Sequence, residues 1–407
     1  MNKRLYHWLV VLSCCGLSTA SLGLCVNCAG VFFAPVAQAL NVGIGDVSVF
    51  VTILNLANGF LGPVAVKLTK KVNVRVLIGI SGLTACMGFV GLSRITALWQ
   101  LYALALIIGI SNAFYGMVLV TLLIGNWFRE RMGLAVGIAL SFSGLMGAVM
   151  SPVFSSLIDG IGWRNAYLTA ALVILAAVLP ALIFVRLQPG EKGLLPYGAS
   201  ETEQEALKAK TGKETRRSFA GAEFGLLLVV SALCAALSAF GSHMSGYGTS
   251  IGLTATAGAY MISATMMGNT VSKLLIGILS DAVGPKKACI LITGLTFGGF
   301  TILAVFASGP MALLVAGAFL VGTSYSIGGV GLSNMSKALF GQNFASAYSY
   351  ITAASFVGSA VAVAAIGYSF DMTGSYLPAL IAGLIFAIVS ILSILLAYRL
   401  HGRSVTR

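Results

Sequence analysis

Two ionisable side chains, Lys273 and His243, fall inside long apolar stretches of the sequence. A charge in such a place is costly unless it has a partner or serves a transport pathway. Lys273 stands eight residues before Asp281, or about 12 Å along a helix, which is too deep for its side chain to reach water easily. No Asp or Glu lies deep in any apolar stretch. The sequence therefore predicts that Lys273 contacts an anionic substrate; the alternative is a structural lysine that is neutral or bonded to helix carbonyls.

His243 offers a second kind of chemistry. Imidazole is the side chain whose ordinary pKa lies nearest to neutrality, so it can take up and release a proton during a transport cycle. We expect His243 to couple transport to protons. Lys273 is a second candidate for this role, because a lysine loses its proton more readily than an arginine when it is buried. A packed, hydrogen-bonded histidine is the alternative interpretation.

Neutral polar side chains in the same stretches complete the candidate binding site. Asn112 and Tyr115 stand three positions apart, and Asn269 stands four positions before Lys273, so each pair shares one face of a helix. Amides and phenols are the groups that a mostly apolar pocket uses to orient a small polar ligand, although they also bridge helices in membranes. Weaker candidates of the same kind are Asn27, Asn55, Asn58 and Asn334.

Other kinds of chemistry find no support in the sequence. The apolar stretches contain no pairing of a nucleophile with a base, no metal-ligand cluster and no phosphate-binding loop, so we expect no enzyme activity, no cofactor and no metal. The seven cysteines lie within or at the ends of apolar stretches. This is typical of small packing residues and not of a disulfide framework.

The elements that must position these side chains are predicted to cross a membrane. Hydrophobic residues make up 58% of the 407 residues and charged residues 9%, whereas a soluble domain carries roughly 25% charged residues. A membrane-spanning helix needs about 20 apolar residues. The stretches of this kind cover approximately residues 6–34, 46–66, 74–93, 97–126, 132–156, 164–186, 222–248, 256–280, 288–307, 310–336, 344–368 and 375–399. We predict an all-α integral membrane protein with twelve transmembrane helices.

The formal net charge of +13 raises the question of nucleic-acid binding, which the placement of the basic residues answers. They cluster in the short gaps between apolar stretches, as expected for cytoplasmic loops. Of the 24 Lys and Arg residues, Arg94 and Arg164 fall on the opposite side and Lys273 within a span, so 21 share one side. We predict a multi-pass protein of the cytoplasmic (inner) membrane, with both termini in the cytoplasm and a lipid bilayer, not nucleic acid, as its surroundings.

One long polar segment divides the chain into two halves. It covers residues 188–220, between six predicted spans in residues 1–187 and six in residues 221–407, and we interpret it as a cytoplasmic linker with a short surface helix. The loop GPVAVKLTKK (62–71) after the second span is echoed by GILSDAVGPK (277–286) after the eighth. Such parallel halves are typical of transporters built from internal repeats, with the substrate site near the midplane between them.

These two glycine-led basic loops resemble the signature of the major facilitator superfamily, in which two Gly, one Asp and several basic residues recur at fixed spacing. The second loop keeps Gly277, Asp281 and Gly284, whereas the first has Val66 and Thr69 at the positions of the Asp and the second Gly. The resemblance implies that such loops control the change of conformation. The residues that would carry this role are Gly62, Lys67, Lys70, Lys71, Gly277, Asp281, Gly284 and Lys286.

Four further segments resemble the oxalate/formate antiporter and monocarboxylate transporter branch of that superfamily. They are WFRERMGLAVG (127–137), GWRNAY (162–167), PGEKGLLPYG (189–198) and FGQNFASAY (340–348). Arg129 and Arg131 in the first of them join the conformational residues. In that branch the position of Lys273 usually holds an arginine that binds a substrate carboxylate, the seventh span often holds a histidine, and a tyrosine at the position of Tyr325 lines the cavity.

The sequence as a whole predicts a transporter that moves a small organic monoanion by alternating access of its two halves. Span 344–368 contains no Lys or Arg, whereas the oxalate carrier of the resembling branch has a lysine there. With Lys273 as the single central cation, a monocarboxylate balances the charge better than a dicarboxylate. Proton-coupled transport by a monomeric unit is the leading hypothesis. Exchange of one organic anion for another, and an anion-binding membrane sensor without net transport, are the alternatives.

Overall fold

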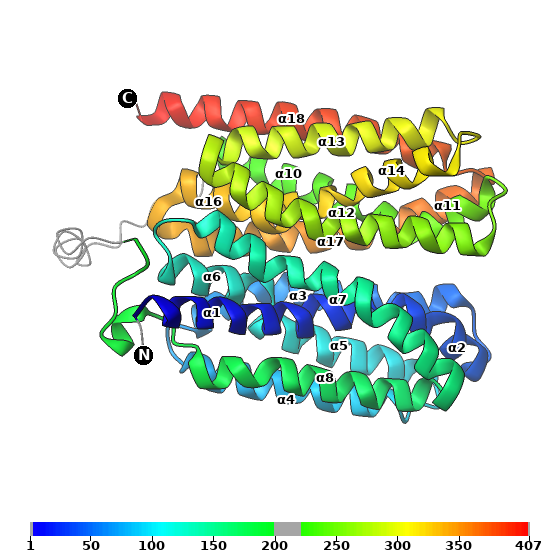
Figure 1. The fold of residues 1–407 in the computed structure, drawn as a ribbon, viewed down its shortest axis with the longest axis horizontal. Coiled ribbons are helices and arrows are strands. Elements are labelled where there is room, and N and C mark those ends of the chain that lie inside the picture. The colour runs from blue at the N-terminus through cyan, green and yellow to red at the C-terminus, as the bar shows by residue number, and fades with distance from the viewer. Residues whose placement is uncertain (1–2, 199–220, 406–407) are drawn as a thin grey trace.

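The computed structural model describes residues 3–198 and 221–405, and most of both ranges is helical. Within these ranges the β-type pairing is limited to an isolated bridge between Phe128 and Tyr197. The helices form two bundles that lie side by side, and the two chain ends lie at the same end of the molecule (Figure 1). We call this end the terminal end and the opposite one the distal end.

The first bundle consists of the helices that precede residue 199. In chain order its elements are α1 (Lys3–Ser18), the π-helix η1 (Thr19–Asn27), α2 (Gly30–Leu40), α3 (Ile44–Leu68), α4 (Val74–Leu92), α5 (Leu98–Tyr115), α6 (Met117–Trp127), α7 (Met132–Ile161), α8 (Trp163–Phe184) and the 3-10 turn η2 (Pro189–Lys192). The turn between α7 and α8 is a single residue, Gly162, with φ of 83°. Glycine suits this position because a side chain disfavours positive φ.

The second bundle repeats this plan. Its elements are α10 (Ala222–Ala239), η3 (Phe240–His243), α11 (Met244–Ser250), α12 (Ala255–Val283), α13 (Pro285–Val305), α14 (Met311–Gly322), α15 (Ser324–Ser326), the π-helix η4 (Ile327–Gly331), α16 (Leu332–Phe340), η5 (Gly341–Asn343), α17 (Phe344–Thr373) and α18 (Leu377–Val405). The motif residue Gly284, with φ of 87°, forms the turn between α12 and α13. Pro285 follows it at the first position of α13, where the fixed φ of proline suits a helix start.

Eleven segments of the described chain are long and apolar enough to cross a membrane. One of them, Met311–Phe370, is 60 residues long. It contains two of the predicted spans, which a turn at Gly341 (φ 54°) separates. The structure therefore confirms the predicted all-helical fold, with twelve spans when this segment is counted as two.

Four of the spans are interrupted, and they are every third span along the chain. The first contains η1, the fourth breaks at Gly116 between α5 and α6, the seventh contains η3, and the tenth contains η4. Interrupted helices inside a membrane leave backbone groups for other partners and are found at the binding sites of transporters. The predicted spans are continuous at all four places, so the structure adds these breaks to the predicted plan.

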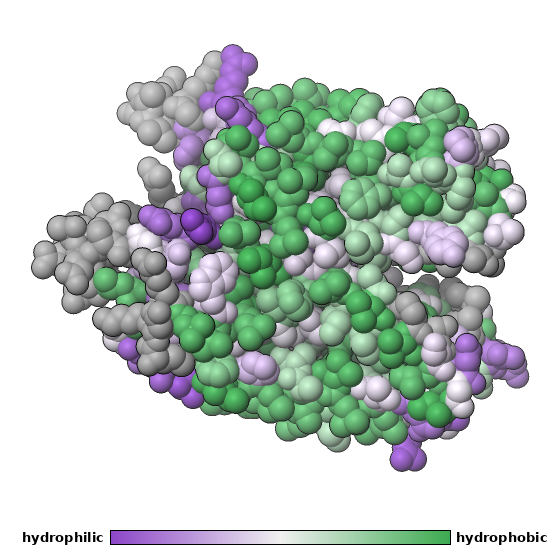
Figure 2. All heavy atoms as spheres, in the orientation of Figure 1, coloured by the Kyte–Doolittle hydropathy of each residue, from purple (hydrophilic) through white to green (hydrophobic). Residues whose placement is uncertain are grey.

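Large apolar side chains cover the outside of both bundles. Phe60, Leu172 and Val361 are 71%, 67% and 64% exposed. Figure 2 shows hydrophobic residues across the middle of the visible face, with hydrophilic residues gathered towards its ends. A soluble monomer rarely exposes contiguous apolar patches of this extent. The outer surface is therefore the one that meets lipid, as the composition predicts.

Helices α7 and α12 form the main contact between the bundles, and glycines bring their backbones together. A Cβ atom on Gly277 of α12 would lie 2.4 Å from the carbonyl oxygen of Gly133 in α7. One on Gly137 would lie 2.6 Å from the carbonyl oxygen of Lys273. A side chain does not fit at either position, so small residues set the separation of the two helices. Helices α3 and α17 form the second contact between the bundles.

The first part of the predicted linker packs against the terminal end of the first bundle. The backbone N–H of Tyr197 donates to the carbonyl oxygen of Trp127 (2.8 Å), and its carbonyl oxygen accepts from the N–H of Arg129 (2.9 Å). Residues 189–198 are therefore attached to the turn that precedes α7. The rest of the predicted linker, residues 199–220 with the predicted surface helix, lies outside the described residues.

Candidate functional site

One face of α12 carries Asn269, Lys273, Gly277 and Asp281, each four positions after the last. Residues at this spacing lie one above another along a helix, and contacts of all four show that this face meets α7. The row runs from the middle of α12 to the terminal end. Each of its residues meets a different part of the first bundle.

Lys273 is buried, with 5% of its surface exposed, and it reaches across to the first bundle. Its Nζ donates to Ser143 Oγ (2.7 Å) and to the carbonyl oxygen of Leu140 (3.2 Å), both in α7. Within the described chain these two neutral oxygens are its hydrogen-bond acceptors, and no carboxylate pairs with it. A helix carbonyl is the partner that the structural alternative predicted. Two neutral acceptors nevertheless leave a buried charge without a counter-charge.

Asn269 is fully buried one turn before Lys273, and its amide is poorly satisfied. Among the described residues Oδ1 has no hydrogen-bond partner, and Nδ2 lies 4.0 Å from the sulfur of Met266, a weak acceptor. Gly144 of α7 packs closely against this amide, because a Cβ atom there would lie 3.2 Å from it. Buried polar groups in native proteins nearly always have partners. The amide of Asn269 is therefore a group that a ligand can satisfy.

Asn27, at the end of η1, brings a third helix to the same region. Its Nδ2 donates to the carbonyl oxygen of Ser143 (2.8 Å). Gly147 accommodates it, because a Cβ atom there would lie 3.0 Å from the Cβ of Asn27. Asn27 is among the weaker candidates that the sequence indicates, and Ser143 is not among the candidates, since a serine in an apolar span resembles a packing residue. The signal that was available is the pair Gly144 and Gly147, one and four positions after Ser143.

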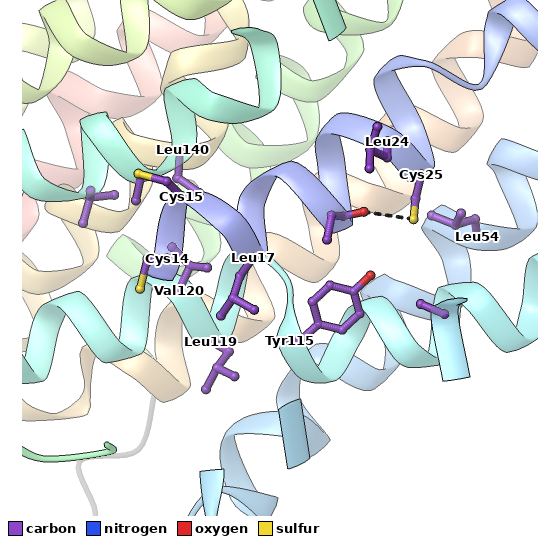
Figure 3. Close-up of a cluster of buried hydrophobic side chains, with 14 of the residues drawn as sticks. Cys14, Cys15, Leu17, Leu24, Cys25, Leu54, Tyr115, Leu119, Val120 and Leu140 are labelled. Carbon is purple, nitrogen blue, oxygen red and sulfur yellow. Dashed lines mark hydrogen bonds between the residues drawn. The ribbon is translucent and has the colours of Figure 1, made fainter. Parts of the chain in front are cut away.

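The structure places Asn112 and Tyr115 against η1, inside the first bundle, and does not bring them into contact with Lys273. Asn112 Nδ2 donates to the carbonyl oxygen of Ser21 in η1 (3.3 Å). Figure 3 shows the phenol of Tyr115 pointing towards Cys25 among apolar side chains. Asn112 Oδ1 and the Tyr115 hydroxyl have no hydrogen-bond partner among the described residues. Both residues belong to α5 of the interrupted fourth span and face η1 of the interrupted first span, and their role in binding stays a prediction.

His243 belongs to η3 in the second bundle, and Tyr325 lies beside Gly241 of the same turn. A Cβ atom on Gly241 would lie 2.6 Å from the Tyr325 hydroxyl. His243 is half-buried, with Nε2 3.0 Å from the carbonyl oxygen of Val363 in α17 and its ring packed on Tyr376. Because a carbonyl oxygen only accepts, this contact assigns the hydrogen of the neutral ring to Nε2 and leaves Nδ1 to take up a proton. The structure therefore connects His243 to α17 and not to Lys273.

Asp281, at the terminal end of the α12 row, caps α7 across the two bundles. Its Oδ1 accepts from the N–H of Gly133 (3.1 Å) and its Oδ2 from the N–H of Leu134 (2.9 Å). The residue before α7, Arg131, has φ of 55° and makes no side-chain cap, so these first N–H groups need an acceptor from elsewhere. A carboxylate is well suited because the helix dipole is positive at this end. The Asp281 cap therefore ties the two bundles together.

The other motif residues are divided between the two contacts of the bundles, because Gly62, Lys67, Lys70 and Lys71 belong to the end of α3 and the loop after it. The exposed basic side chains are Lys67, Lys70, Lys71, Arg129 and Arg131. Lys286 Nζ lies 5.8 Å from the ring centroid of Tyr398. Gly62 faces α17, where a Cβ atom would lie 3.7 Å from the carbonyl oxygen of Ser349. Val66, which replaces the Asp of the first loop, is buried, so the first loop offers no carboxylate equivalent to that of Asp281.

A second cation, Lys337 of α16, also crosses between the bundles. It is half-buried, and its Nζ donates to the carbonyl oxygen of Phe128, just before α7 (3.3 Å). From the sequence, Lys337 is expected among the basic residues of the loops, because it directly follows span 310–336. The structure makes it a second tie at the terminal end, beside the Asp281 cap.

Comparison with known proteins agrees with this architecture. The sequence matches the family described as Major Facilitator Superfamily over residues 15–268 and 226–406. Monocarboxylate transporter 13 of Rattus norvegicus is 24% identical over 376 residues, which cover 91% of this chain and 84% of that protein. Monocarboxylate transporter 4 of Gallus gallus is 22% identical over 91% of this chain and 78% of its own length. The crystal structure of FucP, a transporter of the same superfamily in the outward conformation, has a TM-score of 0.68 at 16% identity and covers 98% of this chain and 99% of its own.

Proposed function

The chain belongs to the major facilitator superfamily and is a transporter, not an enzyme, and we propose that it carries a small monocarboxylate across the cytoplasmic membrane by alternating access. The observation that carries this proposal is the buried ammonium of Lys273, which lies between the bundles with neutral oxygens as its described partners. An anion would balance its charge. The names of the monocarboxylate transporters among the relatives support the same class of substrate.

A single negative charge suits this region. Helix α17, which corresponds to the predicted eleventh span, contains no Lys or Arg. Lys337 lies at the terminal end, where the carbonyl oxygen of Phe128 holds it. One ammonium therefore meets one carboxylate, and the amide of Asn269 one turn away is a second polar group that can orient the anion.

We propose that the terminal end faces the cytoplasm, because the basic loops lie there. The Asp281 cap and the contact of Lys337 with Phe128 close this end, whereas Figure 2 shows a notch between the bundles at the distal end. In the proposed cycle, the anion enters from the distal side and reaches Lys273. Opening towards the cytoplasm then requires that both terminal ties are broken.

We propose that His243 couples anion transport to protons. Its ring lies in the interrupted seventh span and contacts α17, which is one of the two helices of the second contact between the bundles. A proton taken up at Nδ1 would therefore act through α17, and its effect on Lys273 would be indirect. Exchange of anions needs no such group, so the transport assay has to separate the two mechanisms.

Uptake into liposomes that contain the purified protein tests the proposal. Labelled formate, acetate and propionate serve as probes, with oxalate as the dianion control, in three conditions: an inward proton gradient, no gradient, and unlabelled anion inside. Faster uptake of a monocarboxylate with the gradient supports proton symport. Uptake that requires internal anion indicates exchange, and binding without flux indicates a sensor. A clear preference for oxalate over all three monocarboxylates would contradict the proposed charge balance.

A further inference from the structure

We propose that Ser143 is the residue that holds the substrate-free transporter in its closed state, by binding the ammonium of Lys273 until an anion replaces it. This inference rests on the proposed function, because it names what the substrate displaces. Ser143 belongs to α7 of the first bundle and Lys273 to α12 of the second. Their 2.7 Å hydrogen bond therefore joins the two bodies that must move relative to each other.

The hydrogen bonds of Ser143 suit a contact that has to be released. Its hydroxyl donates to the carbonyl oxygen of Leu140 (2.8 Å), so the lone pairs of Oγ face the ammonium. When Lys273 leaves, the serine keeps this donor bond and no buried hydrogen is left without an acceptor. Asn27 keeps the carbonyl oxygen of Ser143 occupied at the same time (2.8 Å). When Lys273 is released, the hydroxyl hydrogen and the carbonyl oxygen of Ser143 therefore both keep a hydrogen-bond partner within the first bundle.

The ammonium, by contrast, loses two acceptors when it leaves. Lys273 is buried, and an unpaired charge in such a place is strongly unfavourable. In the substrate-free protein the tie to Ser143 and Leu140 therefore resists separation of α7 and α12. A carboxylate bound to Nζ is a stronger acceptor than a hydroxyl, because it carries full charge, and it moves with the second bundle. Once the anion is bound, the ammonium of Lys273 no longer needs the oxygens of Ser143 and Leu140 on the first bundle as acceptors.

Two consequences follow for the Ser143→Ala variant. The substrate-free protein should open at the terminal end more often, because one of the two acceptors of the ammonium is gone. Anion binding should become tighter, roughly three- to tenfold, because the anion no longer competes with the hydroxyl for Lys273; tenfold corresponds to about 1.4 kcal/mol. If Ser143 instead contacted the substrate directly, Ser143→Ala would weaken anion binding.

The matched control is Ser141→Ala in the same helix. Ser141 is buried like Ser143, and its hydroxyl makes the same kind of bond, to the carbonyl oxygen three residues earlier (Ile138, 2.8 Å). It has no hydrogen bond to Lys273 among the described contacts. Each variant removes one buried hydroxyl from the same turn of α7. A change that arises only from destabilising this helix should therefore appear in both variants.

The experiment measures the distance between spin labels at Lys71→Cys and Lys287→Cys, two exposed positions at the terminal end of different bundles. The seven native cysteines are buried, which favours labelling of the added ones. Without substrate, Ser143→Ala should increase the population at the longer distance at least about threefold, and Ser141→Ala should not. An unchanged distribution in Ser143→Ala, or an equal change in both variants, would overturn the proposed tie.

Acetate is the probe for the second measurement. Tighter acetate binding by Ser143→Ala than by wild type and Ser141→Ala supports the competition, and weaker or unchanged binding refutes it. Should acetate bind to none of these proteins, the function proposed for this anion fails, while the distance measurement without substrate still decides whether Ser143 holds the closed state.

Discussion

Asp281 of the second bundle accepts a hydrogen bond from the backbone N–H of Gly133 in the first bundle, at 3.1 Å and across 148 positions of sequence. A helix N-terminus normally receives its cap from a residue next to it in the chain. Here the start of α7 is satisfied from the opposite half, and only while the two halves are together at the terminal end. The cap therefore contributes to the closed state and not to the fold of either bundle alone.

Replacement of Asp281 by Asn should open the terminal end. The variant keeps an oxygen acceptor and loses the charge that the helix dipole favours, a loss of about 1 kcal/mol or roughly fivefold in the ratio of closed to open molecules. The spin-label pair at positions 71 and 287 measures this ratio. Asp159→Asn, which removes an exposed carboxylate at the end of α7 away from the cap, is the control. Equal distributions in Asp281→Asn and wild type would show that the cap does not hold the bundles.

Replacement of Lys273 by Gln should abolish most substrate binding. Glutamine keeps a hydrogen-bond donor but deletes the charge, and loss of a buried, charge-assisted hydrogen bond costs on the order of 2–5 kcal/mol, or roughly 30- to several thousand-fold in affinity. Lys273→Arg should retain part of the binding with altered selectivity, because its planar fork differs from an ammonium. The measurement is the dissociation constant of folded, purified variants for the best monocarboxylate of the uptake panel.

A purely structural lysine would behave differently. Lys273→Gln would then lower the folded yield or the melting temperature, and the surviving protein would bind with a dissociation constant within about threefold of wild type. That outcome would remove Lys273 from the binding site.

Replacement of His243 by Ala should weaken the acceleration of uptake by an inward proton gradient, because the variant has no imidazole to take up the proton. His243→Gln separates this role from packing, since an amide N–H can still donate to the carbonyl oxygen of Val363 but does not titrate. Both variants should lose gradient dependence to a similar extent in the liposome assay. If His243→Gln kept the full response of wild type, the histidine would be structural and Lys273 would become the candidate for the proton.

A cysteine at position 192 should be inaccessible from outside intact cells. Lys192 is exposed in η2 at the terminal end, and Ser308 is exposed in the turn between α13 and α14 at the distal end. With native cysteines that are all buried, an impermeant thiol reagent should label Ser308→Cys and spare Lys192→Cys, because basic loops stay in the cytoplasm. The reverse pattern would mean that the terminal end faces outwards.

The spans could be predicted because lipid imposes a simple rule on sequence: every crossing needs a long apolar stretch, and basic residues collect between them. The interruptions of the helices could not be predicted, because they depend on contacts with residues far away in the sequence. The π-helix η1 lies in an apolar stretch without proline. The carbonyl oxygen of its Ser21 accepts from the Asn112 side chain, and the side-chain amide of its Asn27 donates to the carbonyl oxygen of Ser143.

The candidate site shows the same division. Lys273 was found because a deep cation is rare, whereas Ser143 was missed because it stands 130 positions away and serine is common in membrane helices. Asn112 and Tyr115 were grouped with Lys273 by residue type alone, and the structure places them against η1. The polarity of a side chain in an apolar span thus identified candidate binding residues. Which residues each of them contacts could be learned only from the three-dimensional structure.

The glycine crossing of α7 and α12 has a consequence for how the switch operates. Gly277 touches Gly133 backbone to backbone, and it stands four positions after Lys273 and four before Asp281, so each polar tie lies about 6 Å from the crossing. The close contact is not confined to this point, because Gly137 meets the carbonyl oxygen of Lys273 in the same way. Lys273 and Asp281 therefore stand on one helix that packs closely along α7, and a displacement of α12 that breaks one tie also strains the other. The geometry favours loss of both ties in a single step.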